Sequence, residues 1–221
     1  MKRTSRKPSQ LSKSLHRQLA NYAAAASAAG VGMLALVQPA DAKVVYTPAS
    51  LTIAPNGAYL LDLNHDGTTD FRIANYYLCS AQICTGKLNA YPATGNGVEG
   101  MKGVRSIPFA YALPRGSRIG PKVPFSGQFM AGGGSIGLGQ WIDVNDRYLG
   151  FRFGVDGKLH YGWARLSVTV AEQRLSITAI LTGYAYETIP NKPIVAGKTK
   201  GKDVITVRSG TLGHLARGAR Q

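Results

Sequence analysis

The sequence predicts an all-β fold, a single antiparallel β-sandwich of the jelly-roll or lectin-like kind that follows an N-terminal signal peptide. Between residues 43 and 190, short apolar or alternating stretches are separated by Gly, Pro, Asn and Asp, and no long stretch repeats apolar residues at the 3.6-residue period of a helix. Each alternating strand buries one face, so two sheets are expected to share an apolar layer.

The clearest predicted element is a hairpin over residues 148–170. Large apolar residues alternate along its first strand, and Asp156-Gly157 is a pair that favours a two-residue type I′ turn. The return strand contains two apolar sets of opposite parity: Leu159, Tyr161 and Trp163, then Leu166, Val168 and Val170. To keep both sets on one face, period-2 geometry requires a bulge or bend near residues 164–165. A third strand is expected over residues 175–186.

A long segment rich in glycine and proline, residues 85–140, lies between the first strands and this hairpin. Structureless loops of that length are uncommon inside compact domains, so we expect short strands within residues 106–113 and 124–130.

Residues 1–42 have the three parts of a secretory signal peptide. A leader with six basic residues precedes an uncharged run of 16 residues from Tyr22 to Val37, and Ala40, Asp41 and Ala42 form an A-x-A end. We expect cleavage after Ala42 and a protein that is secreted, at the cell surface or in the periplasm. An uncleaved anchor is the alternative, and membrane contact is expected only through that segment.

The net charge of +15 is concentrated at the two ends of the chain. Residues 43–190 contain 13 basic and nine acidic residues, whereas residues 191–221 contain seven basic and one acidic. A nucleic-acid-binding protein needs its basic residues on the folded part, so we expect no nucleic-acid partner. Residues 43–195 are predicted to form the β-sandwich domain and residues 196–221 a basic flexible tail.

The chain has two cysteines, Cys79 and Cys84. In an exported protein such a pair favours a disulfide, and four intervening residues allow it to close across a hairpin end. A metal site is the alternative, but no histidine or acidic residue lies close to the pair in sequence.

The strongest chemical motif is the segment DLNHDGTTD, residues 62–70. Calcium prefers oxygen ligands, and alternate oxygen-bearing side chains followed by a glycine are typical of a loop that wraps this ion. An EF-hand would have a bidentate Glu at its twelfth position, where this chain has Ile73. The segment is similar to short calcium loops between two strands, which predicts a calcium site, and a metal-free turn is the alternative. The predicted ligands are Asp62, Asn64, Asp66, Thr68 and Asp70.

We identify no set of catalytic residues in the sequence. A hydrolase that uses two carboxylates remains open, because several acidic residues have no other assigned role: Glu99, Asp143, Asp146, Asp156, Glu172 and Glu187. Turn positions are the other interpretation of the three aspartates. The segment from His160 to Trp163 could stack on a sugar or lie in the core.

The segments 148–168 and 185–188, together with the loop at 62–71, resemble uncharacterised exported bacterial β-sandwich proteins of the kind associated with PEP-CTERM-like sorting tails. Residues 210–219 are similar to the start of such tails but lack Pro-Glu-Pro and an apolar helix. The resemblance implies export and a β-sandwich. It supplies no activity that could be transferred to this chain.

The expected function is therefore that of an exported non-enzymatic module in surface structure, adhesion or glycan contact. Surface polysaccharide or other cell-envelope components are the expected partners. The alternative is a carbohydrate-active hydrolase on a lectin-like sandwich.

Overall fold

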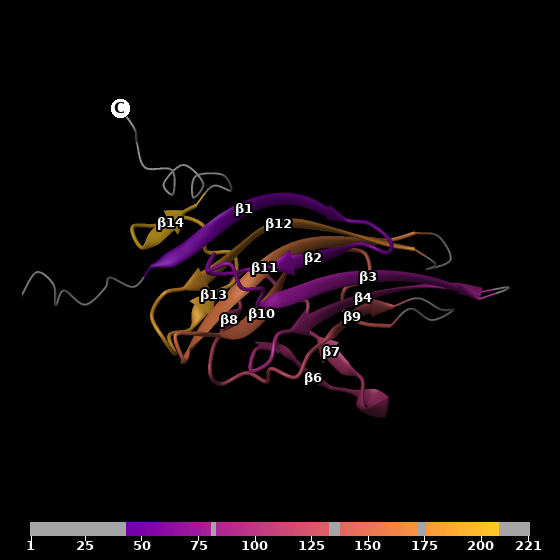
Figure 1. The fold of residues 1–221 in the computed structure, drawn as a ribbon, viewed down its shortest axis with the longest axis horizontal. Helices are drawn as coiled ribbons and strands as arrows, with labels where there is room; N and C mark the ends of the chain where they lie inside the picture. The colour runs from indigo at the N-terminus through magenta and orange to yellow at the C-terminus, as the bar shows by residue number, and fades with distance from the viewer. Residues whose placement is uncertain (1–42, 81–82, 133–137, 172–175, 208–221) are drawn as a thin grey trace, which may run out of the picture. The chain divides into compact units, whose positions relative to one another are not determined.

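The computed structural model describes residues 43–80, 83–132, 138–171 and 176–207. In these residues the protein is all-β, with two six-stranded sheets packed face to face and no α-helix, which confirms the predicted sandwich (Figure 1). The predicted signal peptide, residues 1–42, lies outside the described residues.

Sheet A has the strand order β14-β1-β12-β11-β10-β5. Its strands are β1 (Val44–Ile53), β5 (Gly97–Val98), β10 (Val144–Val155), β11 (Lys158–Val170), β12 (Ile177–Glu187) and β14 (Val204–Thr206). All neighbouring pairs are antiparallel except β1 and β14, which run parallel.

Sheet B has the order β2-β3-β4-β9-β7-β6. Its strands are β2 (Ala58–Leu61), β3 (Phe71–Ser80), β4 (Ile83–Pro92), β6 (Gly100–Lys102), β7 (Pro108–Ala110) and β9 (Phe129–Gly132), and the 3-10 turn η1 (Val104–Ser106) connects β6 to β7. The glycine- and proline-rich segment contains the short strands β5 to β9; β7 lies within the predicted strand at 106–113, and β9 overlaps the one predicted at 124–130. A further two-stranded sheet pairs β8 (Arg118–Ile119) with β13 (Ile194–Val195).

The main core fills the space between the two sheets. Phe71 of β3 and Phe151 of β10 stack with ring centroids 4.1 Å apart, and both side chains are fully buried. Aromatic pairs of this kind add about 1 kcal/mol to the area that they bury. This contact joins the first predicted strands to the C-terminal hairpin.

The predicted hairpin is present, and Asp156 and Gly157 connect β10 to β11 with φ values of 50° and 73°. These positive values are those that a type I′ turn requires. The bulge predicted in β11 is wrong, because β11 pairs with β10 without interruption from Lys158 to Leu166. A register shift does occur beside Arg165, but the extra residue is Thr182 of β12. The Arg165 Nε–H donates to Thr182 Oγ1 at 2.6 Å and anchors this bulged residue.

The two apolar sets of β11 face opposite sides of sheet A. Leu166 and Val168 belong to the main core, whereas Tyr161 and Trp163 belong to a second apolar cluster. That cluster contains Ile119 of β8 and Ile194 of β13, so the small sheet covers this end of the outer face of sheet A (Figure 1). A strand buried on both faces needs no bulge to hide both sets.

The domain extends further than the sequence indicated. Residues 204–206, predicted to lie in a flexible tail that starts at residue 196, form β14 at the edge of sheet A, in register with Val44 to Tyr46. The Val207 N–H also donates to the Tyr46 carbonyl oxygen at 2.9 Å. A charged and glycine-rich composition hid this strand, because three paired residues are too few to produce a periodic signal. Residues 208–221 lie outside the described part.

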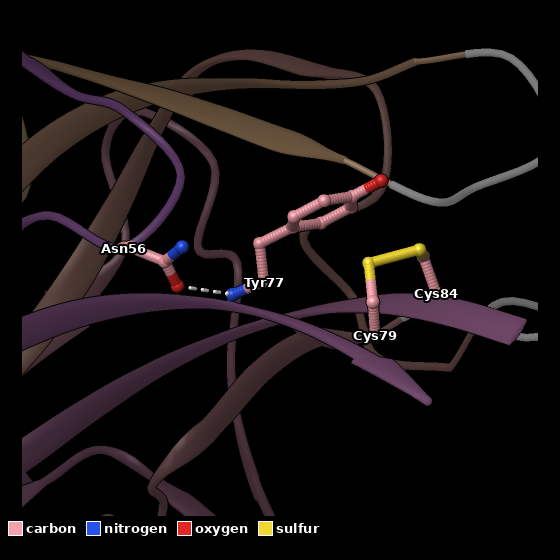
Figure 2. The surroundings of a disulfide bond; sticks show 4 residues. All are labelled: Asn56, Tyr77, Cys79 and Cys84. Atoms are coloured by element: carbon pink, nitrogen blue, oxygen red, sulfur yellow. Dashed lines mark hydrogen bonds between the residues drawn. A yellow bond between two sulfur atoms is a disulfide. The ribbon is translucent and has the colours of Figure 1, made fainter. Parts of the chain in front are cut away.

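Cys79 and Cys84 form the predicted disulfide, with an S–S distance of 2.07 Å. The two residues face each other across β3 and β4, and Figure 2 shows the bond near the end of this hairpin. Two residues before the cysteine, the Tyr77 N–H donates to Asn56 Oδ1 at 2.9 Å (Figure 2). The β3–β4 hairpin is therefore fixed both by the disulfide and by the turn that precedes β2.

Replacing both cysteines by serine should lower the free energy of unfolding by about 2 kcal/mol, because the disulfide closes a short loop. The sandwich should stay folded, since nine other residue pairs join β3 and β4. Urea unfolding measures the change, and reductant should destabilise the wild type by the same amount without affecting the variant. Complete unfolding of the variant would contradict this role.

Candidate functional site

The predicted calcium loop connects β2 to β3 at one end of sheet B. The Asp62 carboxylate accepts backbone N–H groups from three residues of the loop, His65, Asp66 and Gly67, at 2.7–3.3 Å. His65 has a φ of 62°, and its Nε2 lies 2.9 Å from Thr47 Oγ1 on β1. The loop is thus wrapped around Asp62 and attached to sheet A.

The Asp66 carboxylate accepts hydrogen bonds from the Asn64 side-chain amide at 2.8 Å and from the Thr68 N–H at 2.7 Å. These bonds stabilise its ionised form and lower the pKa of Asp66. Asp66 and Thr68 are exposed at the tip of the loop. The side chains that the sequence predicted to act together therefore do lie in one hydrogen-bonded loop.

Asp70 is 6 % exposed and lies at the base of the same loop, where its Oδ2 accepts the Leu63 N–H at 2.9 Å. Burial, with a contribution from the negative charges of Asp62 and Asp66, raises the pKa of Asp70 to about 6. The loop therefore places the negative charges of Asp62 and Asp66 close to the buried carboxyl group of Asp70. A bound cation would remove this repulsion.

Carboxylate oxygens have a second lone pair available after one hydrogen bond, so the loop retains acceptors that suit a hard cation. Among the described residues, however, no three His, Cys, Asp or Glu side chains are grouped closely enough to hold a metal ion. Calcium binding by Asp62, Asn64, Asp66, Thr68 and Asp70 stays a prediction.

Four of the acidic residues considered for a hydrolase have local structural roles. Asp143, Asp146 and Asp156 have positive φ values of 47–50°; Asp143 and Asp156 lie in a bend and a turn, whereas Asp146 lies at a bulge inside β10 and not in a turn. Glu187 forms an ion pair of 3.1 Å with Lys192. Asp146 and Asp156 flank most of β10, which places them roughly 30 Å apart at 3.4 Å per residue. Glu172 lies outside the described residues.

Glu99 differs from these residues because it is buried on the outer face of sheet A. It is 4 % exposed, its Oε2 has no hydrogen-bond partner among the described residues, and burial raises its pKa to about 7. It lies over Gly150, where an added Cβ would come within 2.5 Å of Oε2. The absence of a side chain at Gly150 therefore leaves the space that the Glu99 carboxyl group occupies.

The sugar-stacking interpretation of residues 160–163 is wrong. His160 is 6 % exposed, with its Nδ1 2.9 Å from the Glu187 carbonyl oxygen, and Tyr161 and Trp163 lie inside the second apolar cluster. Buried rings cannot reach a polysaccharide. The alternative interpretation, that these aromatics are core residues, is confirmed.

Exposed or partly exposed basic and aromatic side chains instead gather on the outer face of sheet B, together with the buried amide of Asn89. We call this group the aromatic–basic face; its members are Arg72, Tyr76, Lys87, Asn89, Tyr91, Phe109 and Phe129. The Arg72 guanidinium lies 5.8 Å from the ring centre of Tyr76 and 5.9 Å from that of Tyr91.

Hydrogen bonds hold the hydroxyl groups of this face in place. The Asn89 amide donates to the Tyr91 hydroxyl at 2.6 Å, and Arg72 donates to the Tyr76 hydroxyl at 3.1 Å. Hydrogen bonds from Tyr91 and Arg72 lower the pKa of Tyr76. At the β9 side, the Lys87 ammonium lies 6.0 Å from the centre of the Phe129 ring. The face is therefore an ordered arrangement of rings, cations and one amide.

This face was not predicted from the sequence, although part of a signal for it exists. Arg72, Ala74 and Tyr76 are alternate residues of β3, and Lys87, Asn89 and Tyr91 are alternate residues of β4, but Ala74 and Asn89 are themselves buried. Period-2 alternation places each set on one side of its strand. The pairing of β3 with β4, which brings the two sets together, is a tertiary fact that the alternation alone does not supply.

No protein-family model, no curated protein and no solved structure matches this chain. Within the ranges that the structure describes, no helix is long and apolar enough to cross a membrane.

Millimolar calcium should raise the melting temperature of the wild type, and EDTA should reverse the rise, because a ligand that binds only the folded state stabilises it by about 2.7 kcal/mol at a hundredfold excess over Kd. Asp66→Ala should abolish the response and leave the fold intact. Asp156→Asn, at an exposed turn elsewhere, is the control. A wild-type melting curve that ignores both calcium and EDTA would show that the loop is only a turn.

Glu99→Gln should flatten the dependence of stability on pH. The pKa of Glu99 is raised from 4.5 to about 7 in the folded state, so the folded protein loses stability as the pH rises through this interval, by about 1–3 kcal/mol. Glutamine does not ionise, so the variant should be more stable than the wild type at pH 8 and similar at pH 4.5. Urea midpoints across this range measure the effect. An unchanged slope would mean that Glu99 is solvated.

Proposed function

We propose that this protein is an exported, non-catalytic β-sandwich module that contacts glycans of the cell surface or envelope. The signal-peptide pattern of residues 1–42 supports export, and the Cys79–Cys84 disulfide is consistent with an oxidising compartment outside the cytosol.

The aromatic–basic face is the observation that carries the proposal. Sugars combine apolar C–H faces with many hydroxyl groups, and a site for them needs aromatic surface together with fixed hydrogen-bonding groups. Tyr76 and Tyr91 provide the rings, with centroids 6.4 Å apart, and Arg72 and Asn89 provide the fixed polar groups. All four come from two long paired strands, so the face is rigid.

A binding role also agrees with the distribution of acidic groups. Glu99 is buried, Asp143 and Asp156 occupy a bend and a turn at the two ends of β10, and Asp146 lies at the β10 bulge. The favoured function therefore needs recognition by a preformed surface and no reaction step.

The Tyr76→Ala, Tyr91→Ala double variant should bind envelope polysaccharide at least tenfold more weakly than the wild type, because each ring contributes about 1 kcal/mol or more through contact area. Affinity electrophoresis in gels that contain the polysaccharide measures the change. Tyr77→Ala is the matched control, because Tyr77 is the neighbouring residue of β3, also partly exposed, and points to the other side of the strand.

Two outcomes would contradict this function. The first is that the wild type is not retarded by any polysaccharide of the envelope. The second is that Tyr77→Ala weakens the retardation as much as the double variant does, which would place the contact elsewhere.

A further inference from the structure

We propose that the glycan recognised by this module is acidic, and that a cavity beside β4 holds a carboxylate-bearing sugar of a uronate polysaccharide. The inference rests on the proposed glycan-binding function and adds to it the chemical class of the ligand and the place where its charge is bound.

The first observation is the charge of sheet B. None of its six strands contains an Asp or Glu, whereas β3, β4 and β6 contain Arg72, Lys87 and Lys102, and η1 adds Arg105. None of these four cations forms a salt bridge within the described part of the chain, where the ion pairs involve Arg165, Lys192 and Lys198. These four cations are therefore not neutralised by ion pairs in the described residues, and they complement an anionic partner.

The second observation is a cavity of about 320 Å³ next to the aromatic–basic face. Besides three aliphatic side chains, the residues that line it are Lys87, Asn89, Arg105, Ser106, Gln128 and Phe129. Two of them are exposed cations, and the others offer an aromatic ring, two amides and a hydroxyl. This combination provides donors for a carboxylate and apolar area for a ring.

The third observation is that Asn89 is a buried polar side chain with an unused group. Asn89 is 3 % exposed, its amide nitrogen donates to the Tyr91 hydroxyl, and its Oδ1 has no partner among the described residues. A buried amide oxygen without a donor costs free energy. A sugar hydroxyl in the cavity that Asn89 lines is a donor of the required kind.

The backbone around Arg105 supports the same assignment. Arg105 and Ser106 have φ values of 57° and 59°, a conformation that costs free energy for residues other than glycine, and both line the cavity. Strained backbone beside a cavity is typical of ligand sites.

The cavity and the aromatic rings form one continuous site. Lys87, Asn89 and Tyr91 are alternate residues of β4, so their side chains follow one another along a row of about 14 Å. Arg72 and Tyr76 lie beside this row on β3. A polymer that places its carboxylate between Lys87 and Arg105 therefore lies beside Tyr76, which is opposite Lys87, and can extend over Asn89 to Tyr91.

The test compares polygalacturonate with its methyl ester, which keeps the sugar backbone and removes the charge, and compares alginate with its ester in the same way. Affinities come from calorimetry on the full-length protein. We expect the wild type to bind at least one acidic polymer about tenfold more tightly than the corresponding ester. The preference should fall as salt rises.

The variant that removes the charge is Lys87→Gln combined with Arg105→Asn, with asparagine chosen because it tolerates the positive φ at 105. We expect this variant to bind the acidic and esterified polymers equally. Lys158→Gln, which removes an exposed cation at the start of β11 in sheet A, is the matched control and should keep the preference. Circular dichroism confirms that each variant is folded.

Three other outcomes would contradict the acidic-glycan inference, the glycan-binding function or both. Equal binding of acidic and esterified polymers by the wild type would overturn the inference and leave the glycan-binding function standing. Absence of binding to every glycan, neutral ones included, would overturn both. Tighter binding to DNA or to vesicles of anionic lipid than to the acidic polymers would mean that the positive face serves a different class of partner.

Discussion

The burial of β11 on both of its faces is the constraint on which the rest of the structure depends. Leu166 and Val168 face sheet B, whereas Tyr161 and Trp163 face the cover formed by β8 and β13. One strand therefore joins two apolar layers, and the segments that contain β8 and β13 must fold back over sheet A to complete the second layer. Because that layer occupies one end of the outer face of sheet A, the buried aromatics of β11 serve stability, whereas the rings of Tyr76 and Tyr91 on sheet B are partly exposed.

Two carboxyl groups of the fold are buried at a cost in free energy. Asp70 and Glu99 are both nearly inaccessible, and burial raises the pKa of each. Asp70 is compensated by the Leu63 N–H and lies in a loop that offers further oxygen ligands. Glu99 has no such compensation, because its Oε2 has no hydrogen-bond partner among the described residues. The sandwich tolerates this cost because the surrounding apolar burial is extensive.

Most of the fold class and the hairpin could be predicted from the sequence because they depend on local signals. Period-2 alternation, the Asp156-Gly157 turn and the Cys79–Cys84 spacing each act over a few residues, and the structure contains all three. The prediction of a bulge at residues 164–165 was wrong because it allowed β11 only one buried face. Strand β14 was missed because its pairing with β1 joins residues about 160 positions apart.

In the candidate site too, the local features could be predicted from the sequence and the long-range features could not. The hydrogen-bonded loop at 62–70 could be predicted because its polar side chains are close in sequence. The aromatic–basic face could not, because it exists only after β3 and β4 pair and after Phe129 arrives from β9. Aromatic residues in the sequence gave no indication of which rings are buried, and the most prominent cluster, at 160–163, proved to be core.

Tyrosine nitration with and without a bound acidic oligosaccharide tests the central claim most directly, because it reports which rings the ligand covers. The account predicts that the ligand protects Tyr76 and Tyr91 from nitration and leaves the reactivity of Tyr77 unchanged. Protection that is confined to tyrosines outside β3 and β4, or equal reactivity of Tyr76 and Tyr91 in the free and bound protein, would contradict it.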